Sequence, residues 1–424
     1  MFLKLVLFII IALNLTDNIL GAWLHARAGN QALALQVIYV KYAVVGGVFV
    51  AFLFDLVNGF KLRSHEWCGL LYLAAVVVLG VGIIAAHSQY SAASRLYLYM
   101  FPVILYYAGV YFGARSAFDT QYLVKAELYS YLGMAALFCV LNVYFGAITI
   151  WRDYLDYAGF ILDVKGFTDD VVEGLHGNFF FNYKGGQIVR FLGSFGDPLA
   201  LAYAGMILIV PTYFVFPRQR LLFCGALIVI VAASFTRAVF LFLPIGALIY
   251  WLSPRRGFMI CLAAAFFGIV AIIFAGDLIS GLSDNSSTTA HVLSVNMVLD
   301  FINVPTLLGG ALASNNMPGF EPGFFNMLFL FGFVPFALFL MFLRGIYANN
   351  SLEGSRTAYI AIIMLIAVLT LSIVSSVFFA TTSAWFAWFL AGFVSRRSII
   401  VLPDLRTVDE NGRGAVPGNG DIER

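Results

Sequence analysis

The chain has 424 residues, of which 62% are hydrophobic and 11% charged, whereas soluble domains carry roughly 25% charged residues. Its mean hydropathy is +0.93 and its formal net charge is +2. This composition excludes a soluble globular protein, and continuous apolar runs of about 20 residues exclude a membrane β-barrel, whose strands alternate apolar and polar residues. We therefore expect an all-α, polytopic membrane bundle.

Twelve apolar runs are long enough, or nearly long enough, to span a membrane. The two runs in 221–252 are each short for a full span of about 20 residues. They indicate two helices that meet at a membrane-embedded turn near Arg237, and a single long bent helix is the alternative. The twelve predicted runs are 2–23, 34–57, 68–87, 95–113, 127–150, 198–216, 221–235, 238–252, 258–280, 323–343, 357–378 and 381–395.

The distribution of lysine and arginine predicts the orientation, because cytoplasmic connections of membrane proteins are enriched in both. With the N-terminus in the cytoplasm, thirteen basic residues fall on the inner side and seven on the outer side. Two long segments, 151–197 and 281–322, then face away from the cytoplasm. We expect one transmembrane domain over 1–397, cytoplasmic termini, and a polar, disordered tail over 398–424.

No residue pattern indicates a cofactor. The four cysteines all lie in apolar runs, so they form neither a disulfide framework nor a zinc-binding spacing. No phosphate loop, nucleophile elbow or dinucleotide fingerprint is present either. We expect no metal, no cofactor and no nucleic-acid partner.

Charged residues inside the first two apolar runs are unusual because a charge in the membrane is costly. Asp17 and Lys41 lie in these runs. They could pair with each other across the two helices, or Lys41 could bind a phosphate.

The first long segment is acidic through most of its length and becomes basic and glycine-rich at its end, before Pro198. Arg190 lies at this end, and Arg237 lies in the short turn after 221–235. An arginine at the membrane boundary indicates a functional site by default, and its planar side chain suits a phosphate. Gly193 and Gly196 would let backbone N–H groups approach an anion closely. An interfacial anchor that reaches the lipid headgroups is the alternative for both arginines.

The second long segment supplies candidate acid–base groups. His291 begins an amphipathic stretch that ends at Pro305 and should lie along the membrane surface, and Gly309 and Gly310 follow. Glu321 precedes the apolar run 323–343. Either His291 or Glu321 could take a proton from a sugar hydroxyl. A helix cap or a surface position is the alternative for His291, and a helix cap is the alternative for Glu321.

Four short motifs, in this order, resemble the O-antigen polymerase/ligase superfamily of membrane glycosyltransferases over roughly residues 185–345. Residues 190–198 (RFLGSFGDP) look like the family's R-x-x-G-x-F-x-x-P entry to a helix. Residues 234–237 (SFTR) look like its S-x-[ST]-R element. Residues 299–310 look like its amphipathic helix ending in P-l-x-G-x-G, and Glu321 with Gly332 looks like its H/E…G-x-x-G segment.

The resemblance favours the polymerase branch, because Ala290-His291 and Glu321 stand where ligases tend to carry arginine and histidine. It implies polymerisation of polyprenyl-diphosphate-linked repeat units on the outer face of the bacterial inner membrane, with possible chain-length-regulator and flippase partners. Arg190, Arg237 and Lys41 would then bind the diphosphate, and Glu321 or His291 would activate the acceptor. A ligase that transfers glycan to lipid A-core, and a flippase for the same lipid-linked sugars, are the alternatives.

Overall fold

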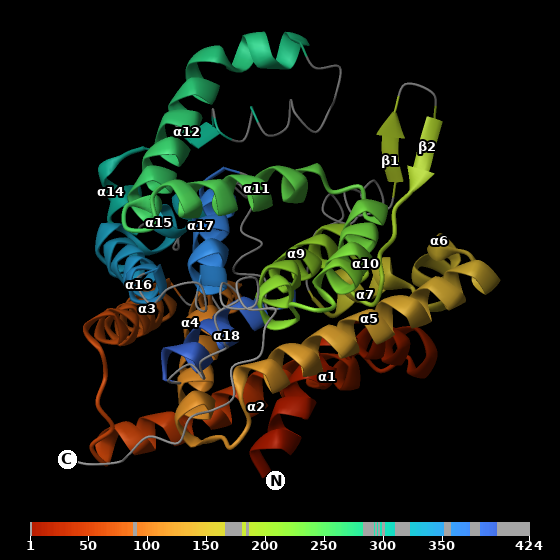
Figure 1. Ribbon diagram of the computed structural model, residues 1–424, viewed down its shortest axis with the longest axis horizontal. Helices are drawn as coiled ribbons and strands as arrows, with labels where there is room; N and C mark the ends of the chain where they lie inside the picture. Colours follow the sequence, from red (N-terminus) through yellow and green to blue (C-terminus); the bar gives the residue numbers. More distant parts are fainter. Residues whose placement is uncertain are drawn as a thin grey trace, which may run out of the picture.

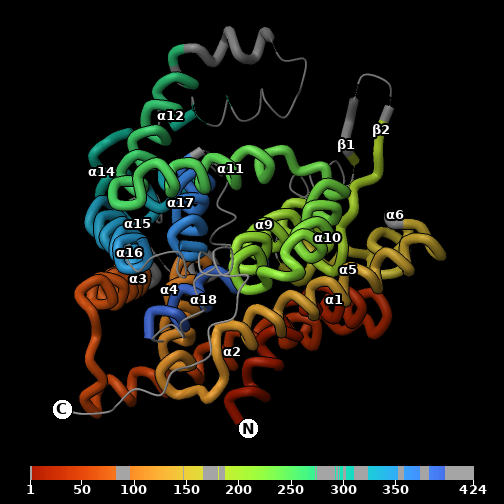
Figure 2. The backbone as a smooth tube through the Cα atoms, in the orientation of Figure 1, coloured from red at the N-terminus to blue at the C-terminus, as the bar shows by residue number. Residues whose placement is uncertain are grey.

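The computed structural model is a bundle of helices with one small hairpin (Figures 1 and 2). It describes residues 2–87, 91–165, 180–183, 186–282, 292, 295, 297–298, 302–309, 323–351, 358–373 and 382–396. His291, Gly310, Glu321 and the tail 398–424 lie outside these residues.

Among the described residues, seven helices are long and apolar enough to cross a membrane, which establishes the chain as an all-α polytopic membrane protein. Five more helices have described apolar parts of 10–17 residues. The long helices are α1 (Phe2–Ala28), α2 (Gln31–Val57), α3 (Ser64–His87), α4 (Ser91–Arg115), α5 (Thr120–Phe145), α9 (Pro198–Val215) and α16 (Phe333–Ser351). The others are α10 (Arg220–Ala233), α11 (Arg237–Leu252), α12 (Gly257–Leu282), α17 (Ala358–Ile373) and α18 (Trp385–Ser395).

The described helices pack into one connected bundle (Figure 1). The helix α1 packs on α2 and α5, α9 packs on α10, and α3 and α18 pack on α4. These parts are joined because α2 also packs on α4, and α9 on α17. The helix α11 contacts α9, α12 and α17, and the hydrogen bond from Thr236 to the carbonyl oxygen of Pro198 places its first residue beside the start of α9.

The prediction of one continuous helix over 323–343 is wrong. The chain forms α15 (Gly323–Phe331), breaks at Gly332, and continues as α16. Gly332 has φ 80°, and a Cβ there would lie 2.7 Å from the carbonyl carbon of Leu308. Gly309, just after the short helix α14 (Val304–Leu307), has φ 94°, and a Cβ there would lie 2.9 Å from the carbonyl carbon of Phe331. Two glycines therefore let the end of the second long segment touch the break.

The short runs in 221–252 form two helices, so the single bent helix is wrong. At 14 and 16 residues, α10 and α11 are about 21 and 24 Å long at ~1.5 Å per residue. Both are shorter than the membrane's hydrocarbon core of about 30 Å.

The first long segment is more structured than a loop. After α5 come α6 (Ala147–Thr149), a π-helical turn (Ile150–Tyr154) and α7 (Tyr157–Asp163). Trp151 is buried against the rings of Phe138 and Tyr157, so this part packs on the bundle. The strands β1 (Phe180–Tyr183) and β2 (Gly186–Val189) then pair as an antiparallel hairpin, which the sequence did not lead us to expect.

Small residues allow the closest helix contact in the bundle core, between α4 and α18. A Cβ at Gly392 would lie 1.8 Å from the carbonyl oxygen of Tyr106. Gly109 and Gly113 of α4 would meet the backbone of Phe389 and Phe393 in the same way. Such glycine contacts are how membrane helices pack without a hydrophobic driving force between them.

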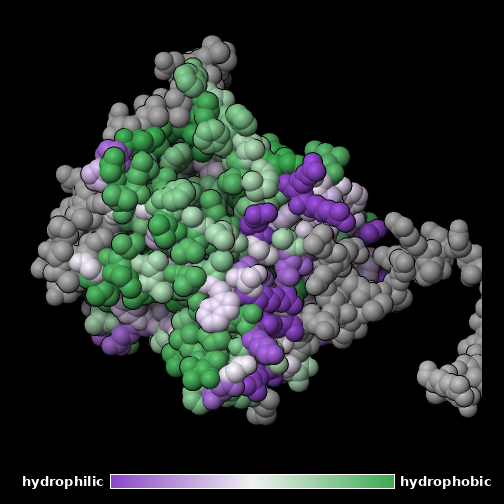
Figure 3. All heavy atoms as spheres, turned by 90° about the vertical axis from the view of Figure 1, so that its left-hand side faces the viewer, coloured by the Kyte–Doolittle hydropathy of each residue, from purple (hydrophilic) through white to green (hydrophobic). Residues whose placement is uncertain are grey.

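The surface matches a membrane protein. In Figure 3 most of the visible described surface is hydrophobic, and the hydrophilic side chains gather in a band along one side of it. Large apolar side chains such as Val143 and Phe274 are more than four-fifths exposed, which is expected where lipid rather than water surrounds the helices.

Candidate anion-binding site

Arg190 is bound to the turn that connects α10 and α11. It follows β2 directly, and its side chain is partly buried. Its Nε donates to the carbonyl oxygen of Ser234 at 2.6 Å, and its Nη2 donates to Oγ1 of Thr236 at 2.9 Å. The N–H of Phe191 donates to the carbonyl oxygen of Ala233 at 2.9 Å. The end of the first long segment is therefore held against the turn.

The turn itself is strained. Phe235 has φ 52°, in the left-handed region that large side chains avoid, and such a residue costs about 1–3 kcal/mol. Ser234 donates its hydroxyl to the carbonyl oxygen of Val231 at 2.6 Å. Thr236 donates to the carbonyl oxygen of Pro198 at 3.4 Å. Contacts from two other segments thus hold a conformation that the turn would not favour alone.

Arg237 is the first residue of α11, and its side chain is exposed. The contact between Thr236 and Pro198 places the N-terminus of α11 beside that of α9. Each helix N-terminus carries a partial positive charge of about +0.5. The side chain of Arg190, the backbone of Arg237 and two helix N-termini therefore lie around one turn, an arrangement that suits an anion with several oxygens, such as a phosphate.

Asp197 interacts electrostatically with Arg190 on one side and with Lys165 on the other. It caps α9 by accepting the N–H of Leu199 at 2.9 Å. Burial raises the pKa of Asp197, and the charges of Arg190 and Lys165 partly offset that rise. Burial also lowers the pKa of Arg190, against the charge of Asp197. Asp197 thus lies between two cations and balances part of their charge.

Lys165 is a third cation of the site. Its Nζ donates to Oδ1 of Asn18 at 2.8 Å, and Nδ2 of Asn18 donates to the carbonyl oxygen of Phe195 at 2.9 Å. Burial lowers the pKa of Lys165 to about 8; Asp17 opposes the shift and Lys41 adds to it. The folded protein therefore releases the proton of Lys165 at a lower pH than an exposed lysine would require.

Lys41 forms an ion pair with Asp17 across α1 and α2. The pairing alternative is thus what the structure contains. Lys41 is 1% exposed and Asp17 3% exposed. The charge of Lys41 acts on the rest of the site by lowering the pKa of Lys165. A direct contact between Lys41 and a phosphate stays a prediction.

The glycines before α9 serve close packing. Gly193 has φ 55° and Gly196 has φ 70°. A Cβ at Gly193 would lie 2.7 Å from Cδ1 of Leu201, and one at Gly196 would lie 2.8 Å from Cζ of Tyr157 and 2.9 Å from Cζ3 of Trp151. Both glycines are needed for the turn that delivers Asp197 to α9.

Of the predicted site residues, Arg190 binds the turn that ends at Arg237. Gly193 and Gly196 pack against Leu201 and Tyr157, and the charge of Lys41 acts on Lys165. Gly309 lies at the break between α15 and α16. The predicted acid–base groups, His291 and Glu321, and Gly310 are outside the described residues. Nearby, Val292, Val295 and Val298 are buried and Met297 is exposed, as expected for one face of the predicted amphipathic helix.

Sequence reasoning missed Lys165, Asp197 and Thr236 as members of the site. Lys165 stands in a segment rich in acidic residues, and no local sequence pattern distinguishes it as a site residue. Asp197 and Thr236 precede helix starts, where Asp and Thr are common caps. Only their position directly before Pro198 and Arg237 could have indicated a role.

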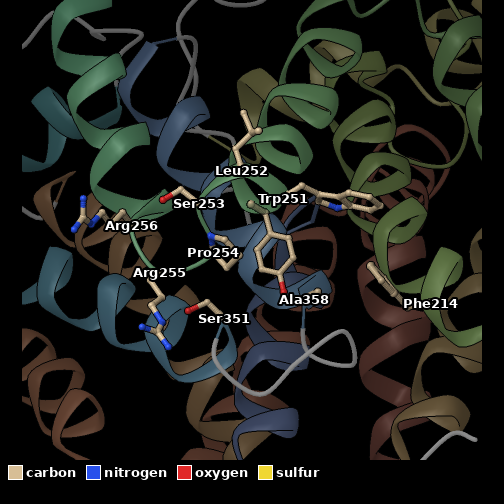
Figure 4. A pocket seen from close by; sticks show the side chains of 10 residues that line it. Phe214, Trp251, Leu252, Ser253, Pro254, Arg255, Arg256, Ser351 and Ala358 are labelled. Carbon is tan, nitrogen blue, oxygen red and sulfur yellow. The ribbon is translucent and has the colours of Figure 1, made fainter. Parts of the chain in front are cut away.

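A pocket of about 770 Å³ lies at the other end of α11, at about 24 Å along the helix from Arg237. Figure 4 shows Arg255 and Arg256 on one side of it and Trp251 and Phe214 on the other. This mixture of arginine and aromatic side chains is typical of a membrane–water interface. The pocket is therefore separate from the arginine site.

Comparison of the chain with protein-family models, with curated proteins and with solved structures found no match.

Proposed function

We propose that the protein polymerises oligosaccharide repeat units that are linked to a polyprenyl diphosphate. One observation carries the proposal: Arg190 holds the strained turn immediately before Arg237, so two arginines from separate segments share one site. A lipid diphosphate is an anion that both could contact. Two of the four motifs that resemble the O-antigen polymerase/ligase superfamily lie in these same segments.

The reaction would be a direct displacement at the anomeric carbon of the donor sugar. The acceptor hydroxyl oxygen forms a bond to this carbon, and the bond from the carbon to the phosphate oxygen breaks. The electron pair leaves with the polyprenyl diphosphate, and the hydroxyl proton passes to Glu321 or His291. The configuration at the anomeric carbon is inverted.

The described residues would supply positive charge where the leaving group becomes negative. Stabilising developing charge with groups that are already in place is commonly the largest catalytic contribution. Arg190 is fixed by its two hydrogen bonds, so it needs no rearrangement when the bond breaks. Arg237 is exposed and can reach the substrate from the surface.

We further propose that the chain has about twelve transmembrane helices in a bacterial inner membrane, with both termini in the cytoplasm and the arginine site on the outer face. The charge distribution of the connections supports this orientation. A flippase that delivers the lipid-linked units and a chain-length regulator would be its partners.

The test is polymerisation by the purified full-length protein supplied with lipid-linked repeat units. Wild type should produce a ladder of products without lipid A-core, which a ligase would not. Arg237→Ala should lower the rate by 100-fold or more, in the range typical of losing one group that stabilises developing charge. Arg190→Lys keeps the charge but loses the paired hydrogen bonds, and should also be impaired.

Arg255→Ala is the matched control, because Arg255 is an exposed arginine at the opposite end of α11. It should retain the ladder. A wild-type protein that makes no ladder, or full ladders from both Arg237→Ala and Arg190→Lys, would refute the proposal.

A further inference from the structure

A carboxyl group without an ionic partner lies inside the membrane-spanning bundle, in Glu127 of α5. Its side chain is 3% exposed. Glu127 stands seven residues after Thr120, the first residue of the helix, or about 10 Å along it. It therefore lies within the span and not at its end.

Glu127 receives a single hydrogen bond, from the indole N–H of Trp385 in α18. Its Oε2 has no hydrogen-bond partner among the described residues. The lysines of α1 and α5 contact aromatic rings: Lys4 lies over the ring of Tyr122, and Lys125 over the ring of Phe216. In the part of the chain that the structure describes, no cation forms an ion pair with Glu127.

The hydroxyl of Tyr131, one turn further along α5, lies within the electrostatic reach of Glu127. It is neutral and donates to the carbonyl oxygen of Leu201 at 2.9 Å.

The charged groups on the elements around α5 pair with one another and not with Glu127. On α1, Asp17 pairs with Lys41. In the π-helical turn after α5, Arg152 pairs with Asp153. Beside α18, Arg396 pairs with Glu66. A carboxylate at Glu127 would therefore be an isolated charge.

An ionised carboxylate inside a membrane-spanning helix is costly, because the membrane interior solvates a charge poorly. A protonated carboxyl group is neutral and avoids this cost. Its carbonyl oxygen can still accept the hydrogen bond from Trp385. We propose that Glu127 is a proton-binding site in the membrane interior, occupied at neutral pH.

This site is independent of the proposed glycosyl transfer, since it lies on different elements from the arginine site. Intramembrane carboxyl groups of this kind form the proton sites of pumps and transporters. The protein would thus exist in two protonation states, and the membrane environment of Glu127 would decide between them.

The test is infrared difference spectroscopy of the full-length protein in lipid nanodiscs at pH 7, comparing wild type with Glu127→Gln. The substitution preserves the shape and the bond from Trp385. It should remove one carbonyl-stretch band of a protonated carboxylic acid and no carboxylate band. Raising the pH should convert this band in wild type and leave the variant unchanged.

Glu66→Gln is the matched control. Glu66 is also buried but pairs with Arg396, so its substitution should remove a carboxylate band; Asp55→Asn, which loses the pairing to Arg115, serves if that variant does not fold. Loss of a carboxylate band in Glu127→Gln would overturn the proposal. So would a wild-type carboxylate band that shifts with added Na⁺, because the occupant would then be a metal cation.

Discussion

Replacing Lys41 by Met should strongly destabilise the protein, because Asp17 would remain buried without its partner. Both side chains of the pair are almost fully buried. Removing one member of a buried ion pair costs about 3–5 kcal/mol, whereas replacing both members with neutral groups is often neutral or stabilising.

The expected cost for Lys41→Met lies near the lower end, at about 3 kcal/mol. Lys165 is electrostatically coupled to both Asp17 and Lys41, so it can take over part of the compensation once Lys41 is gone. The double variant with Asp17→Asn and Lys41→Met should recover to within about 1 kcal/mol of wild type. The two substitutions should therefore be strongly coupled.

Denaturant unfolding of the four proteins of this double-mutant cycle, in detergent micelles, measures the coupling energy. A Lys41→Met variant that loses less than about 1 kcal/mol, or a double variant as unstable as the single one, would refute the reasoning. The same proteins separate two roles of Lys41. A stable double variant that polymerises normally would mean that Lys41 only balances Asp17; one that folds but forms no ladder would assign Lys41 to the substrate.

Two further predictions concern Lys165 and Gly392. Because burial depresses the pKa of Lys165 from 10.5 to about 8, the unfolded chain binds more protons than the folded chain between these values. Stability should therefore rise with pH across this window, and Lys165→Gln should flatten the rise in unfolding measurements; an unchanged slope would contradict the assignment. Gly392→Ala should lower the unfolding temperature because its Cβ would clash with the backbone of Tyr106, whereas Gly225→Ala in α10, which meets nothing within 4 Å, should be neutral or stabilising by up to about 1 kcal/mol. Equal melting temperatures would show that α4 and α18 are not packed this closely.

Hydrophobicity predicted most of the helices well, because a membrane span needs a continuous apolar run and little else. The helix α9 begins at the predicted Pro198, and α10 and α11 lie within a few residues of their predicted bounds. The break at Gly332 was not predictable in this way. It depends on contact with Gly309, which lies far away in the sequence.

The candidate site was predictable in part. Arg190 and Arg237 stand out because charge is rare near apolar runs, and the structure places them on either side of one turn. Their connection through Ser234 and Thr236 needs a tertiary contact that no local pattern encodes. Lys165 joins the site through Asn18, a polar residue inside an apolar run, and this pairing also depends on the fold.

The glycine contact between α4 and α18 also determines when, during translation, these two helices can pack together. Gly392 is translated 283 residues after Gly109, its neighbour across the contact. At roughly 5–20 residues per second, α18 is synthesised about 15–55 s after the glycine face of α4. During that interval its backbone carbonyls face lipid or a provisional neighbour. The bundle is therefore closed by its last described helix, and a chain that stops before α18 would leave its centre open.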